Sequence, residues 1–194
     1  MKTGTVLRTA VAVLAITFGA SMASAQLNSG AQTIALNATL AESLTLSLSA
    51  NTVNFTLTAG SNTNAGTTGV TATTKWVLKP GRTAVGVYAY FASSTAALTG
   101  TASGVNIPSS AFSIADTGAG SGGAGNSGAL TNTVVFGAGN AGLQLANVGI
   151  TGANKNASRT DAMTFNIDLS TGTLPQIPAD TYTGTLNIQA QATP

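Results

Sequence analysis

The chain has no cysteine and no histidine among its 194 residues. Without cysteine it can form no disulfide, thiolate metal site or iron–sulfur cluster, and without histidine it has no imidazole ligand and no Ser-His-Asp triad. Charge is scarce too, because 6% of the residues are charged, against about a quarter in ordinary soluble domains. These absences exclude most enzyme classes, and we expect neither catalysis nor a cofactor.

Residues 1–25 have the pattern of a secretory signal peptide. A positively charged start precedes an apolar run over residues 10–20, and Ala23-Ser24-Ala25 supplies the small residues that signal peptidase requires. We place the cleavage before Gln26. The apolar run is shorter than the ~20 residues that span a bilayer, and no later run is long enough. The sequence therefore predicts an exported protein of the periplasm, cell surface or extracellular space, whose mature part has no membrane span.

Cleavage changes the charge balance of the chain. It removes Lys2 and Arg8 from the seven basic residues and leaves five basic and five acidic residues. Nucleic acid binding requires a basic surface that pairs with phosphates, so we expect no nucleic acid partner. A net charge near zero instead favours association between copies of a protein.

Apolar residues recur at every second position of the mature chain, not at helical spacing. Successive side chains of a strand point to opposite faces, so each such row predicts a half-buried β-strand. The rows are Ile34–Leu40, Leu44–Leu48, Val53–Leu57, Val70–Leu78, Val85–Phe91, Met163–Leu169 and Tyr182–Ala190. Short strands separated by Gly, Asn, Ser and Pro predict an all-β fold, an antiparallel β-sandwich of immunoglobulin-like or pilin-like type, in one domain over residues 26–194.

A glycine-rich segment interrupts the strand pattern near residues 117–128. It lacks the Lys-Ser/Thr ending and the following helix of a phosphate-binding loop. Its centre, Gly118-Ala119-Gly120-Ser121-Gly122-Gly123-Ala124-Gly125, has nothing to bury, so the sequence predicts a flexible loop.

The carboxylates give no sign of an active site or a metal site. A glycosidase needs two of them at a controlled separation across a cleft, and a calcium loop needs closely spaced ligands such as D-x-D-x-D-G. Neither pattern occurs, and we interpret the acidic residues as solvated or turn-capping. They are Glu42, Asp116, Asp161, Asp168 and Asp180.

Two tyrosines form a candidate binding surface. Tyr88 and Tyr90 alternate with the apolar row Val85–Phe91, so they lie side by side on the opposite face of that strand. They either form a patch that contacts a glycan or the cell wall, or cover a second layer of the protein. Trp76 lies on the apolar face of its own row, which predicts a core tryptophan.

Two segments resemble a known group of proteins. Residues 35–56, ALNATLAESLTLSLSANTVNFT, are similar to the opening of secreted β-sandwich proteins allied to spore coat protein U and chaperone–usher fimbrial subunits. Residues 174–190, LPQIPADTYTGTLNIQA, resemble their closing pattern, with Asp180 in place of the usual glycine. The cysteine that these families carry near the first strand break is replaced by Ser43 or Leu44.

A weaker resemblance is to the W-x-L cell-surface domains. Trp76-Val77-Leu78 matches their first motif, whereas Ile188-Gln189-Ala190 stands where the second motif should be. We therefore rank this family below the fimbrial one.

The fimbrial resemblance implies strand exchange between subunits. Each subunit lacks one strand of its sandwich, and an alternating segment of the next subunit fills the groove through main-chain hydrogen bonds and side-chain pockets. The donated segment would be residues 26–40, with Ile34, Leu36, Ala38 and Leu40 as the pocket-filling side chains. Alternatively this row is the first strand of its own sandwich, and the sequence leaves both possibilities open.

We therefore expect an exported structural protein that associates with copies of itself, or with related surface subunits, through strand edges. The alternative is a secreted carbohydrate- or cell-wall-binding module that uses Tyr88 and Tyr90.

Overall fold

The computed structural model describes residues 29–194. The predicted signal peptide and the cleavage site before Gln26 lie outside these residues. Residues 29–42 have no regular secondary structure. Residues 40–194 form a compact unit, which we call the body.

The body is all-β, as the alternating rows predicted. Its only helices are two short 3₁₀ turns, η1 (Ser109–Ala111) and η2 (Leu174–Gln176). The strands are β1 (Ser43–Leu48), β2 (Asn64–Ala65), β3 (Val70–Val77), β4 (Ala84–Tyr90), β5 (Leu98–Gly100), β6 (Asn106–Ile107), β7 (Phe112–Asp116), β8 (Ala119–Gly120), β9 (Gly128–Ala129), β10 (Gly142–Gly149), β11 (Asn156–Ile167), β12 (Tyr182–Thr183) and β13 (Asn187–Thr193).

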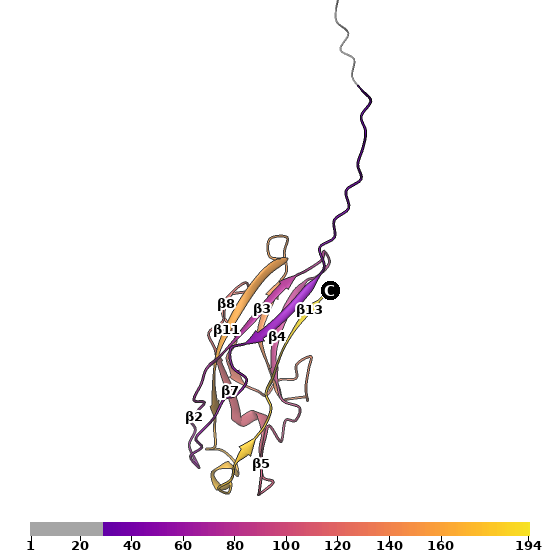
Figure 1. Ribbon diagram of the computed structural model, residues 1–194. Helices are drawn as coiled ribbons and strands as arrows, with labels where there is room; N and C mark the ends of the chain where they lie inside the picture. The colour runs from indigo at the N-terminus through magenta and orange to yellow at the C-terminus, as the bar shows by residue number, and fades with distance from the viewer. Residues whose placement is uncertain (1–28) are drawn as a thin grey trace, which may run out of the picture. The chain divides into compact units, whose positions relative to one another are not determined.

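The strands form two main layers and a small third sheet. The larger layer has the order β1-β3-β11-β7-β9, with β2 and β8 also paired to β11 (Figure 1). The second layer has the order β10-β4-β13, and the small sheet has the order β12-β5-β6. Every strand pair is antiparallel. This arrangement agrees with the predicted antiparallel sandwich.

The core lies between the two main layers. Met163, Phe165 and Ile167 of β11 share one buried cluster with Val87 and Ala89 of β4. The burial of β11 alternates strictly along this part of the strand, as expected for a strand with one face on the core. Packing between these two faces is therefore what joins the layers.

Trp76 confirms the core interpretation of its row. Its side chain is almost fully buried, and its indole N–H donates to the backbone oxygen of Asn154 at 2.8 Å. A buried indole needs such a partner for its one polar atom. The W-x-L motif thus has a packing role here.

The row Ile34–Leu40 is not a strand, so the prediction that it forms one is wrong for the isolated chain. Alternation provides one apolar face, but a strand also needs a neighbouring edge with which to exchange hydrogen bonds. No pairing within the described residues includes this row. Its large side chains are exposed, at 85% for Ile34, 89% for Leu36 and 81% for Leu40.

The row Tyr182–Ala190 is divided between two sheets. Its start, β12, pairs with β5, and its end enters β13, which pairs with β4. The break falls at Gly184, where an added Cβ would collide with the backbone carbonyl of Ala97. This close approach of two backbones requires glycine and separates the two strands. The row Val53–Leu57 likewise makes only an isolated bridge, from Phe55 to Gly66.

Candidate functional site: an apolar groove along the sandwich seam

An open apolar groove of about 1050 Å³ follows the seam between the two main layers. One wall comes from residues 48–59, the chain that follows β1, and the other from residues 177–188, the chain that leads into β13. In Figure 1 these walls are the purple segment below β1 and the yellow segment below β13. We call this feature the seam groove.

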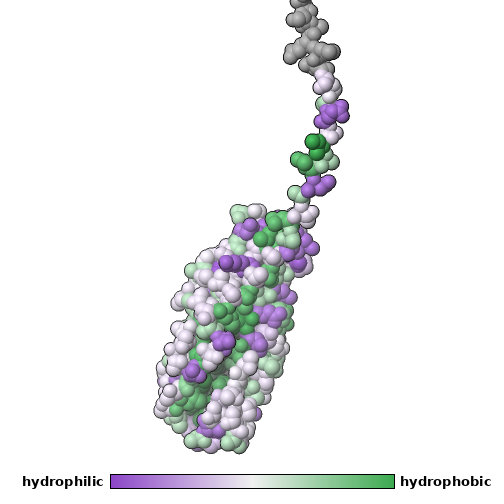
Figure 2. Space-filling view, in the orientation of Figure 1, coloured by the Kyte–Doolittle hydropathy of each residue, from purple (hydrophilic) through white to green (hydrophobic). Residues whose placement is uncertain are grey.

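The floor of the seam groove is the inner face of the larger layer. Met163, Phe165, Ile167 and Leu169 line it at successive alternate positions of β11 and the residues after it. At ~3.3 Å per residue this row covers about 20 Å. Figure 2 shows hydrophobic residues gathered in a long band on the face of the body that the view presents. The floor side chains themselves are almost fully buried, so the apolar surface that a short extended segment would cover is that of the two walls, along the same length.

The walls of the groove carry strand edges without a partner strand. Among the described residues, β1 pairs only with β3 and β13 pairs only with β4. Leu48 at the end of β1 and Ile188 in β13 both line the groove. The two strands lie close to each other over part of their length, so the backbone groups that another strand could pair with are those at the groove, at the end of β1 and the start of β13.

Side chains on the two walls are only partly buried. The half-buried apolar residues that pack against the core here are Val53, Phe55, Leu57, Ile177, Leu186 and Ile188. Inner-face side chains of two packed sheets interdigitate in the core. The partial exposure of these wall residues marks where that packing is incomplete along the seam.

The exposed row Ile34–Leu40 has matching dimensions. Its four alternate side chains Ile34, Leu36, Ala38 and Leu40 cover six residue steps, which is also about 20 Å in an extended chain. Leaving a large aliphatic side chain in water forfeits roughly 1.5–3 kcal/mol relative to burying it. The same chain therefore contains an unfilled apolar groove and an unburied apolar row of the same length and period.

The two candidate tyrosines lie under a covering segment. Tyr88 is buried and Tyr90 half-buried, and both pack on Phe136, with ring centroids 5.7 and 5.8 Å apart. The Tyr90 hydroxyl donates to Oε1 of Gln189 at 2.8 Å, and the Gln144 amide donates to the Tyr88 hydroxyl at 3.4 Å. This arrangement favours the covering role over a sugar-binding platform, because Tyr88 presents almost no free surface.

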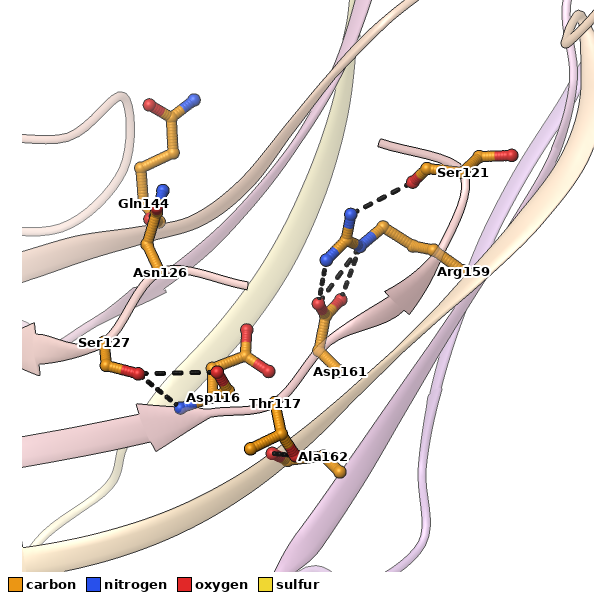
Figure 3. Close-up of polar contacts among 9 residues, drawn as sticks. All are labelled: Asp116, Thr117, Ser121, Asn126, Ser127, Gln144, Arg159, Asp161 and Ala162. Atoms are coloured by element: carbon orange, nitrogen blue, oxygen red, sulfur yellow. Dashed lines mark hydrogen bonds and ion pairs between the residues drawn. The ribbon is translucent and has the colours of Figure 1, made fainter. Parts of the chain in front are cut away.

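Asp116 and Asp161 are buried, so their interpretation as solvated or turn-capping residues is wrong. They lie in the interior with Arg159, and the side chains of Arg159 and Asp161 are both fully buried (Figure 3). Arg159 donates from Nε to Oδ2 of Asp161 at 2.9 Å and from Nη2 to Oδ1. Its Nη1 donates to the backbone oxygen of Ser121 at 3.0 Å. We call Asp116, Arg159 and Asp161 the buried charge cluster.

The sequence contained the signal for this cluster. The alternation that buries Met163 continues backward along β11 and puts Asp161 and Arg159 on the same inner face. Asp116 likewise follows Ile114 on the inner face of β7. Charged residues are almost never fully buried unless paired, so the charge of these residues by itself predicts a solvated position.

The glycine-rich loop covers the buried charge cluster. An added Cβ at Gly118 would collide with side-chain atoms of Asp161 and Arg159, and one at Gly125 would collide with the Asp116 carboxylate. The prediction that this loop has nothing to bury is therefore wrong. Glycine is needed because the loop backbone lies directly on charged side chains.

Two other carboxylates do have the expected turn-capping role. The backbone N–H groups of Ala102 and Ser103 donate to Asp180 at 3.0 and 2.7 Å. These bonds, those from Ser103 first, hold the pKa of Asp180 well below its usual range. Asp168 accepts from the N–H and hydroxyl of Ser170 at 2.8 and 2.6 Å, which lowers its pKa as well.

Glu42 forms a surface ion pair with Arg82. Nε of Arg82 lies 2.7 Å from Oε1 of Glu42, and this hydrogen bond lowers the pKa of Glu42. The pair joins the start of the body to the turn before β4. Exposed pairs of this kind contribute little to stability.

The described residues contain no group of three or more acidic side chains that could hold a metal ion. None of the helices in this part of the chain is long and apolar enough to cross a membrane.

Comparison of the chain with protein-family models, with curated proteins and with solved structures finds no significant match.

Proposed function

We propose that this protein is an exported structural subunit that associates with copies of itself, each copy inserting its segment Ile34–Leu40 into the seam groove of the next. One observation carries the proposal: the chain has an open apolar groove and, outside it, an exposed apolar row of the same length and period. An extended segment that completes a sheet in this way gains main-chain hydrogen bonds and side-chain contacts together.

The side chains of the row suit a strand with one buried face. Ile34, Leu36, Ala38 and Leu40 would enter the groove and cover half-buried apolar side chains of its walls. These include Val53, Leu57 and Leu186. The intervening residues, Ala35, Asn37 and Thr39, are small or polar and suit the solvent side. The row carries no charge that burial would have to desolvate.

The groove wall is also nearly free of charge. Among the residues that line it, Asp180 is the one with an ionisable acidic side chain. Its carboxylate is already occupied by the backbone N–H groups of Ala102 and Ser103. An apolar donor segment therefore meets an apolar wall, and the neutral mature chain adds no long-range repulsion between copies.

Chain connectivity favours exchange between copies over self-completion. The groove begins at Leu48, at the end of β1 away from Ser43, and β1 is about 17 Å long at ~3.3 Å per residue. Leu40 is three residues before Ser43, a reach of at most about 10 Å. A segment folded back on its own body could bring Ile34 to the groove but would leave Leu40 short of it, so all four side chains enter together only when the segment comes from another copy.

Burial of the row gives the assembly its stability. At about 1.5–3 kcal/mol for each large aliphatic side chain, Ile34, Leu36 and Leu40 together contribute enough to offset much of the entropy lost on association. Hydrogen bonds to the free edges of β1 and β13 add about 0.5–1.5 kcal/mol each.

The test is the size of Leu36→Asp and Asn37→Asp variants by light scattering. Both add one negative charge to the same segment, but only Leu36 belongs to the apolar row. We expect the unchanged protein and Asn37→Asp to form oligomers that grow with concentration, and Leu36→Asp to stay monomeric with an unchanged circular dichroism spectrum. Equal assembly of both variants, or a monomeric unchanged protein, would contradict the proposal.

A further inference from the structure

In the buried charge cluster, the side-chain hydrogen bonds satisfy the carboxylate of Asp161 but not that of Asp116. Each nitrogen of the Arg159 guanidinium donates a hydrogen bond, to Asp161 from Nε and Nη2 and to the Ser121 carbonyl from Nη1. Asp116 is 5% exposed, yet neither of its carboxylate oxygens has a hydrogen-bond partner among the described residues. An ionised carboxylate in such a position is strongly unfavourable, so its charge state needs an explanation.

The charged groups that face Asp116 come from one strand. In the part of the chain that the structure describes, the charges that act on Asp116 are those of Asp161 and Arg159, both on β11. The loop after β7 contributes uncharged groups, with the Ser127 hydroxyl accepting from the Asp116 backbone N–H at 2.8 Å. β9 and β10 contain no ionisable residue. The cluster thus holds two carboxylates and one guanidinium.

Protonation of Asp116 removes the excess negative charge of the cluster. Burial raises the pKa of Asp116 to about 7, and the nearby Asp161 carboxylate adds to the rise, while Arg159 and the backbone N–H of Gly118 oppose it. The protonated carboxyl can then donate its O–H to Asp161, which satisfies both groups and leaves the cluster neutral.

The backbone of the glycine-rich loop packs directly against this neutral cluster. Gly118 and Gly125 place backbone directly on Asp161 and Asp116. Gly120 and Gly122 have φ of +105° and +95°, a left-handed conformation that glycine adopts without strain. The loop therefore has a defined closed form that excludes water from the cluster, and water is what an ionised Asp116 would need.

We propose that a proton on Asp116, donated in a hydrogen bond to the Asp161 carboxylate, keeps the glycine-rich loop, residues 118–125, closed, and that loss of this proton opens the loop. Ionised Asp116 beside ionised Asp161 would leave two negative charges against one guanidinium in the interior. Opening the loop lets water solvate both carboxylates. The loop is thus a pH-sensitive element, independent of the seam groove and of any assembly through it.

The first test is hydrogen–deuterium exchange of the full chain at pH 5 and pH 9, with rates corrected for the intrinsic pH dependence of exchange. We expect the protection of amides 118–125 to fall about tenfold or more at pH 9. In Asp116→Asn, a neutral side chain of the same shape, protection should be equal at both values. Asp168→Asn, at an exposed turn, is the control and should behave as the unchanged protein.

A second measurement does not depend on the folding of a variant. Infrared difference spectra of the unchanged protein should show one protonated carboxyl at pH 6 that disappears by pH 9. Absence of this band at pH 6, or loop protection that is the same at pH 5 and pH 9, overturns the proposal. So does an Asp116→Asn variant that loses protection with pH as the unchanged protein does.

Discussion

Arg159 and Asp161 form an ion pair inside the sandwich, with Nε of the guanidinium 2.9 Å from Oδ2 of the carboxylate and neither side chain exposed to solvent. The pair lies two residues along β11 from the apolar floor of the seam groove. One strand therefore builds two different environments, a charged one under the glycine-rich loop and an apolar one that is open along the seam.

Replacing Arg159 with methionine should strongly destabilise the body. The change leaves two buried carboxylates with no cation, and removal of one partner of a buried ion pair costs about 3–5 kcal/mol. The measurement is the free energy of unfolding in urea at pH 7. Lys79→Met is the control, because the Lys79 side chain is 66% exposed, and it should change stability by less than about 0.5 kcal/mol. Similar stability losses in both variants would rule out a special role for the pair.

The pH dependence of stability follows from the directions of the pKa shifts. Asp116 has a raised pKa of about 7 in the folded protein. Between about pH 4 and 7 its carboxyl is therefore ionised in the unfolded chain but still protonated in the folded one. The free energy of unfolding falls as the pH rises through that window. Asp168, Asp180 and Glu42 have lowered pKa values, so their contributions are lost as the pH falls below about 4.

We therefore expect a stability maximum near pH 4–5, measured as the urea midpoint across a pH series. In Asp116→Asn the decline between pH 4 and 7 should disappear, and the maximum should broaden toward neutral pH. A decline of the same size in this variant would mean that another group causes it.

The close contact of the loop with the cluster predicts a cost for small side chains. Gly118→Ala puts a methyl group against Asp161 and Arg159, and such overpacking costs about 1–3 kcal/mol. Gly152→Ala is the matched control, because nothing lies within 4 Å of a Cβ at that position. Thermal unfolding of both variants checks the prediction. It fails if Gly118→Ala is as stable as Gly152→Ala.

Much of the fold follows from local alternation in the sequence. The rows around Trp76, Val87 and Phe165 became β3, β4 and β11 with the predicted faces buried, since a two-residue period is a property of each strand alone. Arg159 and Asp161 obey the same period, but the charge of Asp161 predicts a solvated position, because the sequence does not show the ion pair that allows burial.

The seam groove could not be derived in this way. It exists because residues 48–59 and 177–188, far apart in the chain, form facing walls without a strand between them. Alternation identified Ile34–Leu40 as a potential strand but not which edge it would pair with, because that depends on how the two layers close.

Introduced cysteines test the central claim most directly, since the chain has none of its own. One preparation carries Leu36→Cys and a second, isotopically labelled, carries Leu186→Cys on the groove wall. The two preparations are mixed under oxidising conditions, and the disulfides are identified by mass spectrometry. Asn37→Cys is the matched control for Leu36→Cys. The account predicts disulfides between labelled and unlabelled copies for Leu36→Cys and far fewer for Asn37→Cys. Equal yields for the two positions, or no disulfide between copies, would contradict it.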